Sequence, residues 1–266
     1  MISVIEDIRL LESVSDLEAV RRLYERIWRT GANNPPVTAD FLRALAKAGG
    51  YVSGAYEGDE LVGACFGFFA PPAREALHSH IAGVLAQAQG RNVGFALKLH
   101  QRDWALARGA AEISWTYDPL IRRNAYFNLA KLGAEPSEYL PDFYGPMDDD
   151  VNRSDPTDRL FVRWRLTSPE VEAACAGTPR DAAPAAAAAA PLLDIGPQGR
   201  PCARQTSSQL VKVAVPDDIE TLRGQDPALA AEWRTALREV LGGLLGDGGR
   251  ITGFGRVGWY IVERAA

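Results

Sequence analysis

The clearest indication of chemistry lies between Gly83 and Ala96, in the stretch GVLAQAQGRNVGFA. An apolar run ends there, a turn of small and polar residues follows, and a long helix is predicted directly after it. Free backbone N–H groups at a helix N-terminus, together with the positive end of its dipole, bind anions such as a pyrophosphate. Gly90 and Gly94 would let the backbone approach closely, and Arg91 adds a positive charge. An ordinary strand-to-helix turn uses the same residue types, so both interpretations stay open.

Two other phosphate-binding motifs are excluded by spacing. The pattern G-x-x-x-x-G-K-[ST] does not occur in the sequence. The glycines at 90 and 94 are not spaced as G-x-G-x-x-G, and the preceding strand belongs to a hairpin-rich region rather than to a βαβ unit. The sequence therefore argues against a dinucleotide-binding Rossmann domain.

The same stretch resembles the GNAT superfamily of N-acetyltransferases. Their signature Q/R-x-x-G-x-G/A is matched by Gln89-Gly-Arg-Asn-Val-Gly94, with Asn92 at the first glycine, and a second frame fits Arg91-x-x-Gly94-x-Ala96. Asn is the non-glycine residue that best tolerates left-handed backbone geometry. A later stretch, 124–134, resembles the family helix that ends in K-x-G-F.

The resemblance implies a fold, a co-substrate and a binding site. The fold is α/β (α+β), with a GNAT-like mixed, mostly antiparallel sheet flanked by helices. The co-substrate is acetyl-CoA or another acyl-CoA, and no metal is expected. Backbone and side-chain groups that the resemblance places at CoA belong to Gly83, Val84, Gln89, Gly90, Arg91, Asn92, Val93, Gly94, Phe95 and Asn124.

Three residues are candidates for proton transfer in such a reaction. Asp118 ends the strand after the CoA helix, where the family often has its acid or base, although a turn cap before Pro119 suits an Asp equally well. His80 shares a strand face with a second histidine, and a histidine ordinarily titrates near neutrality, so it is a candidate proton relay. The family often has a tyrosine acid at the position of Leu129, and Tyr126, one turn earlier, is the substitute.

The resemblance leaves several functions open. The leading one is acyl transfer to an amine of a small molecule or amino acid. A catalytically inert CoA-binding sensor is the alternative from another class, favoured by the missing tyrosine. Transfer to oxygen or sulfur, or acyl-CoA decarboxylation, would use the same fold.

Composition limits the partners. The net charge is −5 and the pI about 5.4, which argues against bulk attraction to nucleic acid. No window approaches the roughly 20 apolar residues of a membrane helix, and the N-terminus does not resemble a signal peptide, so a cytoplasmic protein is expected. Three widely separated cysteines predict neither a disulfide framework nor a zinc site.

The sequence predicts three parts. Residues 1–166 form the GNAT-like domain, and 167–209 form a flexible Ala/Pro-rich linker because large apolar residues are sparse there. Residues 210–266 form a small βαββ extension, with a helix that starts at Asp226-Pro227 and carries a wide apolar stripe. Such a stripe must be covered, either by the body of the same chain or by a partner in a homodimer.

Overall fold

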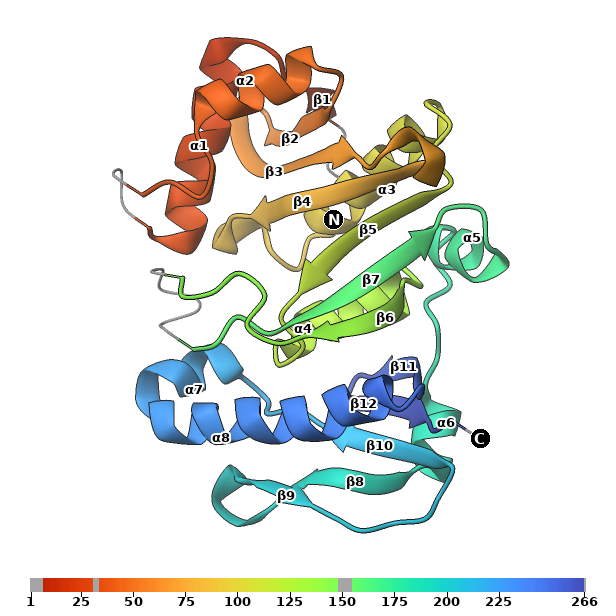
Figure 1. Cartoon of the computed structure of the whole chain (residues 1–266). Coiled ribbons are helices and arrows are strands. Elements are labelled where there is room, and N and C mark those ends of the chain that lie inside the picture. Colours follow the sequence, from red (N-terminus) through yellow and green to blue (C-terminus); the bar gives the residue numbers. More distant parts are fainter. Residues whose placement is uncertain (1–6, 31–33, 148–154, 266) are drawn as a thin grey trace. The chain divides into compact units, whose positions relative to one another are not determined.

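A computed structural model describes residues 7–30, 34–147 and 155–265 of the chain. The chain divides into two compact units, Met1–Trp115 and Thr116–Ala266 (Figure 1). The first boundary predicted from composition, at residue 166, therefore lies inside the second unit.

The first unit contains a mixed sheet in the order β1-β2-β3-β4-β5. Neighbouring strands are antiparallel except β4 and β5, which are parallel. The strands are β1 (Asp7–Leu10), β2 (Tyr51–Glu57), β3 (Glu60–Phe69), β4 (Ala76–Val84) and β5 (Glu112–Tyr117). The helices are α1 (Val14–Trp28), α2 (Ala39–Lys47) and α3 (Val93–Leu106). This is the mixed, mostly antiparallel sheet with flanking helices that the sequence predicts.

The two faces of this sheet carry different helices. On β3, Ala64 and Phe66 belong to a core cluster with Leu17 of α1 and Leu42 of α2. The neighbouring residue Gly63 points the other way, because side chains alternate along a strand. A Cβ atom on Gly63 would lie 3.1 Å from Val93 of α3, so the missing side chain lets α3 pack closely on this face.

The second unit begins with a helix and a hairpin. Helix α4 (Arg122–Ala125) continues into a π-helical turn, Tyr126–Lys131. Strands β6 (Glu135–Leu140) and β7 (Arg159–Arg165) then pair antiparallel.

A second sheet follows in the order β11-β12-β10-β8-β9, with β8 and β10 parallel. Its strands are β8 (Ala190–Ile195), β9 (Pro201–Ala203), β10 (Leu210–Ala214), β11 (Arg250–Gly255) and β12 (Trp259–Glu263). The helices of this part are α5 (Pro169–Cys175), α6 (Ala183–Ala188), α7 (Ile219–Gln225), α8 (Pro227–Leu237) and α9 (Gly243–Gly246). Helix α8 starts as predicted, because the Asp226 side chain accepts a hydrogen bond from the Leu229 N–H at 3.0 Å.

The segment 167–209 differs from the expectation of a flexible linker. It contains α5, α6, β8 and β9. Alanine is the strongest helix former, so the alanine run folds into α6 rather than remaining a coil. Leu193 of β8 is fully buried, and β8 pairs with β10 of the extension. A few well-placed apolar side chains therefore order a segment whose average composition suggests disorder.

The C-terminal extension packs on the earlier part of its own unit. The Tyr260 hydroxyl donates to the Pro119 carbonyl at 2.7 Å. The Arg122 guanidinium donates to the Arg256 carbonyl at 2.6 Å. The stripe on α8 is covered, since Trp233 and Leu237 are fully buried. The apolar face predicted from the sequence is thus covered within the chain.

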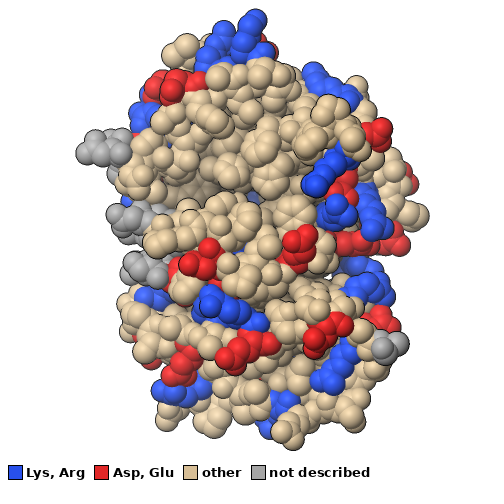
Figure 2. Space-filling view, in the orientation of Figure 1, with Lys and Arg blue, Asp and Glu red and all other residues tan. Residues whose placement is uncertain are grey.

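Surface charge is mixed on the face drawn in Figure 2, where Lys and Arg side chains lie beside Asp and Glu side chains. None of the described helices combines the length and the apolar character needed to cross a bilayer.

Candidate functional site

Strands β4 and β5 pair over only a short stretch. Their register joins Ala76 to Glu112, Leu77 to Ile113 and His78 to Ser114. Strand β4 continues to Val84 and stays paired with β3 on its other edge. The edge of β4 that faces β5 is therefore not paired with β5 after His78. A strand edge of this kind offers backbone N–H and C=O groups to an extended ligand.

A β-bulge lies on β4 where the pairing with β5 stops. Phe66 is opposite Ile81 and Gly67 is opposite Ser79, which leaves His80 as the extra residue. A bulge redirects the side chain that it carries. The His80 ring packs against Phe66, with centroids 5.5 Å apart, and against His78, with centroids 5.9 Å apart.

Both histidines of this strand are held neutral. Burial lowers the pKa of His78 to about 4, with help from the charges of His80 and Lys98. Burial also lowers the pKa of His80. A neutral imidazole has a free nitrogen lone pair, so each ring can accept a proton, but its lowered pKa makes it a weaker base than an exposed histidine.

The predicted CoA loop joins β4 to α3. Gly90 has φ +75° and Asn92 has φ 63°, so both are left-handed. The expected tolerance of Asn92 for this geometry is confirmed. Val93, Gly94 and Phe95 are the first residues of α3, and their N–H groups have no acceptor within the helix. The loop thus ends in the arrangement that favours an anion.

Side chains of the loop make contacts with the β2–β3 hairpin. Arg91 forms an ion pair with Glu57, which neutralises part of the charge predicted to favour phosphate. The Gln87 side chain donates to Glu60 at 3.4 Å. Gln89 turns back instead and donates to the Val84 carbonyl at 3.3 Å.

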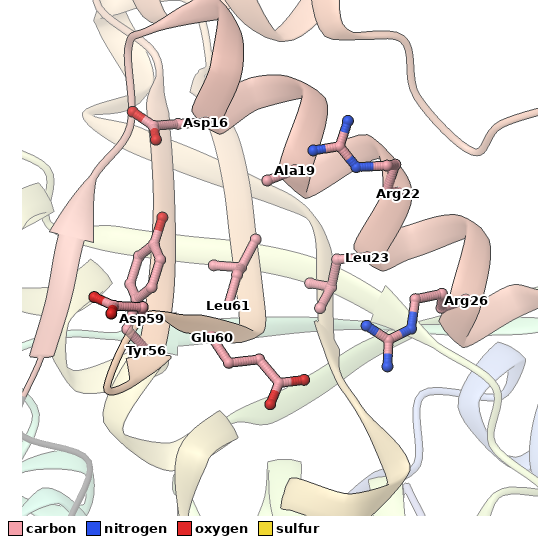
Figure 3. A pocket seen from close by; sticks show the side chains of 9 residues that line it. All are labelled: Asp16, Ala19, Arg22, Leu23, Arg26, Tyr56, Asp59, Glu60 and Leu61. Atoms are coloured by element: carbon pink, nitrogen blue, oxygen red, sulfur yellow. The ribbon is translucent and has the colours of Figure 1, made fainter.

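A hollow of about 390 Å³ lies between α1 and the β2–β3 hairpin (Figure 3). Arg22 and Arg26 extend from α1, while Asp59 and Glu60 come from the hairpin. Because its charges are of both signs and are near balance, the hollow indicates no particular ligand.

Gly83 contacts α1 rather than a free space. A Cβ atom there would lie 2.8 Å from Ile27 and 2.9 Å from Trp28, so only glycine fits. Its backbone and that of Val84 still lie on the part of β4 beyond the short β4–β5 register, as the predicted binding role requires. Asn124, the remaining predicted CoA residue, lies half-buried on α4 in the second unit.

Asp118 lies in a buried ion cluster with Asp155, Arg223 and Arg234. Arg234 donates to both of its carboxylate oxygens, at 3.0 and 2.9 Å, and Arg223 donates to one at 2.5 Å. The same two arginines contact Asp155. Burial alone would raise the pKa of Asp118, but the two guanidinium groups offset it and hold that pKa well below the usual range.

These contacts favour a structural role for Asp118 over the predicted role as a base. A carboxylate with a very low pKa and occupied oxygens is a poor proton acceptor. Asp118 also accepts the Leu120 N–H at 3.0 Å, which is the turn cap that the sequence analysis left open.

Tyr126 is held by the turn between β11 and β12. The Arg256 side chain donates to its hydroxyl at 2.8 Å and lies over its ring. Leu129, at the position where the family often has its tyrosine, is buried. The catalytic role of Tyr126 stays a prediction.

Sequence reasoning missed a buried polar group under β4. Lys98 of α3 donates to the Ser79 hydroxyl at 2.7 Å and to the Gln101 side chain at 3.1 Å. The signal was the helical spacing, because Lys98 and Gln101 share the buried stripe of Leu97 and Trp104. No group of three or more His, Cys, Asp or Glu side chains suited to a metal was found among the described residues.

Comparison with known proteins decides the family of the first part of the chain. The family model described as "Acetyltransferase (GNAT) family" matches residues 17–133. Residues 17–133 form a GNAT acetyltransferase domain. The match includes β4, the predicted CoA loop and α3, and ends at Gly133. Both the family and the fold support acetyl transfer that depends on acyl-CoA.

Solved structures agree on the GNAT fold. An N-acetyltransferase from Staphylococcus aureus Mu50 has a TM-score of 0.50 and 18% identity, over 60% of this chain and 98% of that one. An acetyltransferase from Salmonella typhimurium, solved with acetyl-CoA, has a TM-score of 0.50 and 18% identity, over 61% of this chain and 94% of that one. No curated protein sequence matches the chain closely enough to count as a relative.

Proposed function

We propose that the chain transfers an acetyl group from acetyl-CoA to a primary amine of a small molecule. The observation that carries the proposal is the early end of the β4–β5 register, on the strand that leads into the left-handed loop and the N-terminus of α3. The loop and the first N–H groups of α3 hold the pyrophosphate. The free edge of β4, near Gly83 and Val84, holds the pantetheine arm and directs the thioester along the strand.

His80 is the base in this proposal. An ammonium group attacks a thioester only after it loses a proton, so a nearby base must accept that proton. The neutral His80 ring lies beside His78, with ring centroids 5.9 Å apart, and packs on Phe66. Phe68, 38% exposed and in contact with both histidines, favours an acceptor that carries an apolar or aromatic part beside its amine.

A screen of amines tests the activity directly. Free thiol released from acetyl-CoA is followed with aromatic amines, aliphatic amines and amino acids as acceptors. The His80→Gln variant should lose roughly 10²-fold in kcat while CoA affinity stays near that of the original chain. A histidine away from this face, His100, gives the matched control His100→Gln. If His80→Gln and His100→Gln are equally active, His80 is not the base.

The loop is tested by binding alone. Gly94→Val places a branched side chain at the second position of α3, where the proposal places phosphate. Calorimetry should show a steep loss of CoA affinity with an unchanged circular dichroism spectrum. Unchanged affinity would remove the loop from the site.

An inert CoA-binding module is the second candidate. Leu129 stands where the family often has its acid, and Tyr126 is tied to Arg256. Tight CoA binding with no thiol release across the acceptor screen would favour that candidate.

A further inference from the structure

Within the described residues, Lys98 is a buried cation without an anionic partner. The residue is 4% exposed, and its ammonium group contacts only neutral groups: the Ser79 hydroxyl, the Gln101 side chain and the Trp115 ring, whose centroid is 3.9 Å away. No carboxylate in the described part of the chain lies within ion-pair distance of it. A buried charge without a counterion is costly, so the fold gives up stability to keep it.

The position of Lys98 is specific. The last pair of residues in the β4–β5 register is His78 and Ser114. Ser79 is the next residue on β4 and Trp115 the next on β5. Lys98 thus contacts the first residue of each strand after this last pair, at the end of the β4 edge along which the proposed function directs the thioester.

The groups around Lys98 do not neutralise it. On the strands β1 to β5 and on α3 itself, the titratable groups besides Lys98 are Asp7, Arg9, Tyr51, Tyr56, Glu57, Glu60, Cys65, His78, His80, His100, Arg102, Asp103, Glu112 and Tyr117. Glu57 pairs with Arg91. Asp7 pairs with Arg9, and Asp103 with Arg102. Cys65 lies 3.6 Å from the Ser79 hydroxyl, but burial raises the pKa of this thiol and keeps it neutral.

We propose that Ser79 and Lys98 deliver the proton that the departing CoA thiolate needs. This proposal rests on the proposed function. When the carbon–sulfur bond of the tetrahedral intermediate breaks, its electron pair stays on sulfur. The Ser79 hydroxyl proton passes to sulfur, and a proton of the Lys98 ammonium passes to the Ser79 oxygen. Lys98 is left as a neutral amine and regains a proton from water before the next turnover.

The chemistry of the two groups suits this step. Ser79 accepts a hydrogen bond from Lys98, so its own hydrogen can be donated, in the resting protein to Cys65 Sγ at 3.6 Å and in the reaction to the departing sulfur. Burial lowers the pKa of Lys98 to about 8, near the value of a free thiol. The proton can therefore move to sulfur without a large energetic penalty. Leu129 leaves the usual tyrosine position without a proton donor, and Lys98 supplies one from α3.

The first test needs no acceptor. The thiol of bound CoA is titrated by the ultraviolet absorbance of its thiolate, in the original chain and in Lys98→Met and Ser79→Ala. A nearby ammonium stabilises a thiolate, so the bound thiol should titrate about one pKa unit or more lower in the original chain than in Lys98→Met. Lys212→Met is the matched control, because Lys212 also lies over a tryptophan, Trp259, but in the second unit. It should titrate like the original chain.

The second test uses turnover with an acceptor from the screen. Lys98→Met should lower kcat about tenfold or more with KM for acetyl-CoA nearly unchanged. The original chain should lose rate above about pH 8, where Lys98 loses its proton, and Lys98→Met should not show this fall. A purely structural lysine would leave that alkaline limb in place.

The outcomes separate the two proposals. If CoA does not bind the original chain, the proposed function fails and this inference fails with it. If CoA binds but its thiol titrates alike in the original chain and Lys98→Met, Lys98 has no part in the chemistry, while the proposed function stands. If Lys98→Met does not fold, Lys98→Gln and Ser79→Ala give the same comparison, and an unchanged thiol titration in them overturns the inference.

Discussion

The two units bury charge in opposite ways. In the second unit, Asp118, Asp155, Arg223 and Arg234 form a cluster of two carboxylates and two guanidinium groups. In the first unit, Lys98 is buried alone with neutral partners. Charges that satisfy one another hold a structure together and have little left for chemistry. A lone buried charge costs stability in the resting protein, which is the reason for the proposal that Lys98 acts on a ligand.

The largest effect should follow from opening the paired cluster. Arg234→Met leaves Asp118 and Asp155 buried with one guanidinium between them, so the free energy of unfolding should fall by about 3–5 kcal/mol. Urea unfolding followed by the near-ultraviolet signal measures this. Arg200→Met removes an exposed pair with Glu232 from the same unit and should cost no more than about 1 kcal/mol. Equal losses in the two variants would show that the cluster does not stabilise the unit.

Asp118→Asn should have a smaller effect, because the amide keeps one oxygen as an acceptor. A loss of about 2 kcal/mol is expected. The arginines hold the pKa of Asp118 below its unfolded value of 3.8, so its contribution is full at neutral pH and is lost as the pH falls below about 4. The stability difference between Asp118→Asn and the original chain should therefore shrink in acid. Activity per folded molecule should be retained, and a fall of 10²-fold would restore Asp118 as the base.

For Lys98→Met, the effect of the removed charge on the free energy of unfolding should have the opposite sign. Burial holds the pKa of Lys98 at about 8, below its ordinary value of 10.5, so the charge destabilises the folded state at neutral pH. Between about pH 8 and 10.5 the unfolded chain binds the extra proton, and the original chain should gain stability relative to Lys98→Met, by at most about 3 kcal/mol. Urea titrations at pH 7 and pH 10 measure this gain. A constant difference across that range would mean that Lys98 is not a strained buried cation.

The sequence predicted local features better than long-range ones. The left-handed Asn92 and the Asp226 cap depend on the residue type and its immediate neighbours, and both were predictable. The partners of Asp118 could not be predicted, because Arg223 and Arg234 follow it by 105 and 116 residues.

The average amino-acid composition led to a wrong prediction for one segment of the chain. Residues 167–209 were predicted to be a linker, yet Leu193 and the alanine helix α6 order this part. For Lys98, helical spacing indicates burial, but only the register of β4 and β5 shows that it lies where the strands part. Register depends on pairing across the sheet and is not readable from one strand.

The smallest effect concerns a charge pair that is neither buried nor alone. Glu57 and Arg91 pair at the CoA loop, with side chains 27% and 37% exposed. A pair this open is screened by water, so Glu57→Gln should change the free energy of unfolding by less than about 1 kcal/mol. The variant removes a negative charge beside the proposed pyrophosphate site and frees Arg91 to face phosphate. CoA affinity measured by calorimetry should therefore rise about two- to fivefold at low salt, and the gain should fade at high salt. Glu60→Gln, which removes the hairpin carboxylate that contacts Gln87, is the matched control and should give a smaller gain because it leaves Arg91 paired. If Glu57→Gln weakens CoA binding instead, Glu57 positions the Arg91 side chain for CoA. The exposed pair would then have a structural role, as the buried ion cluster of the second unit has.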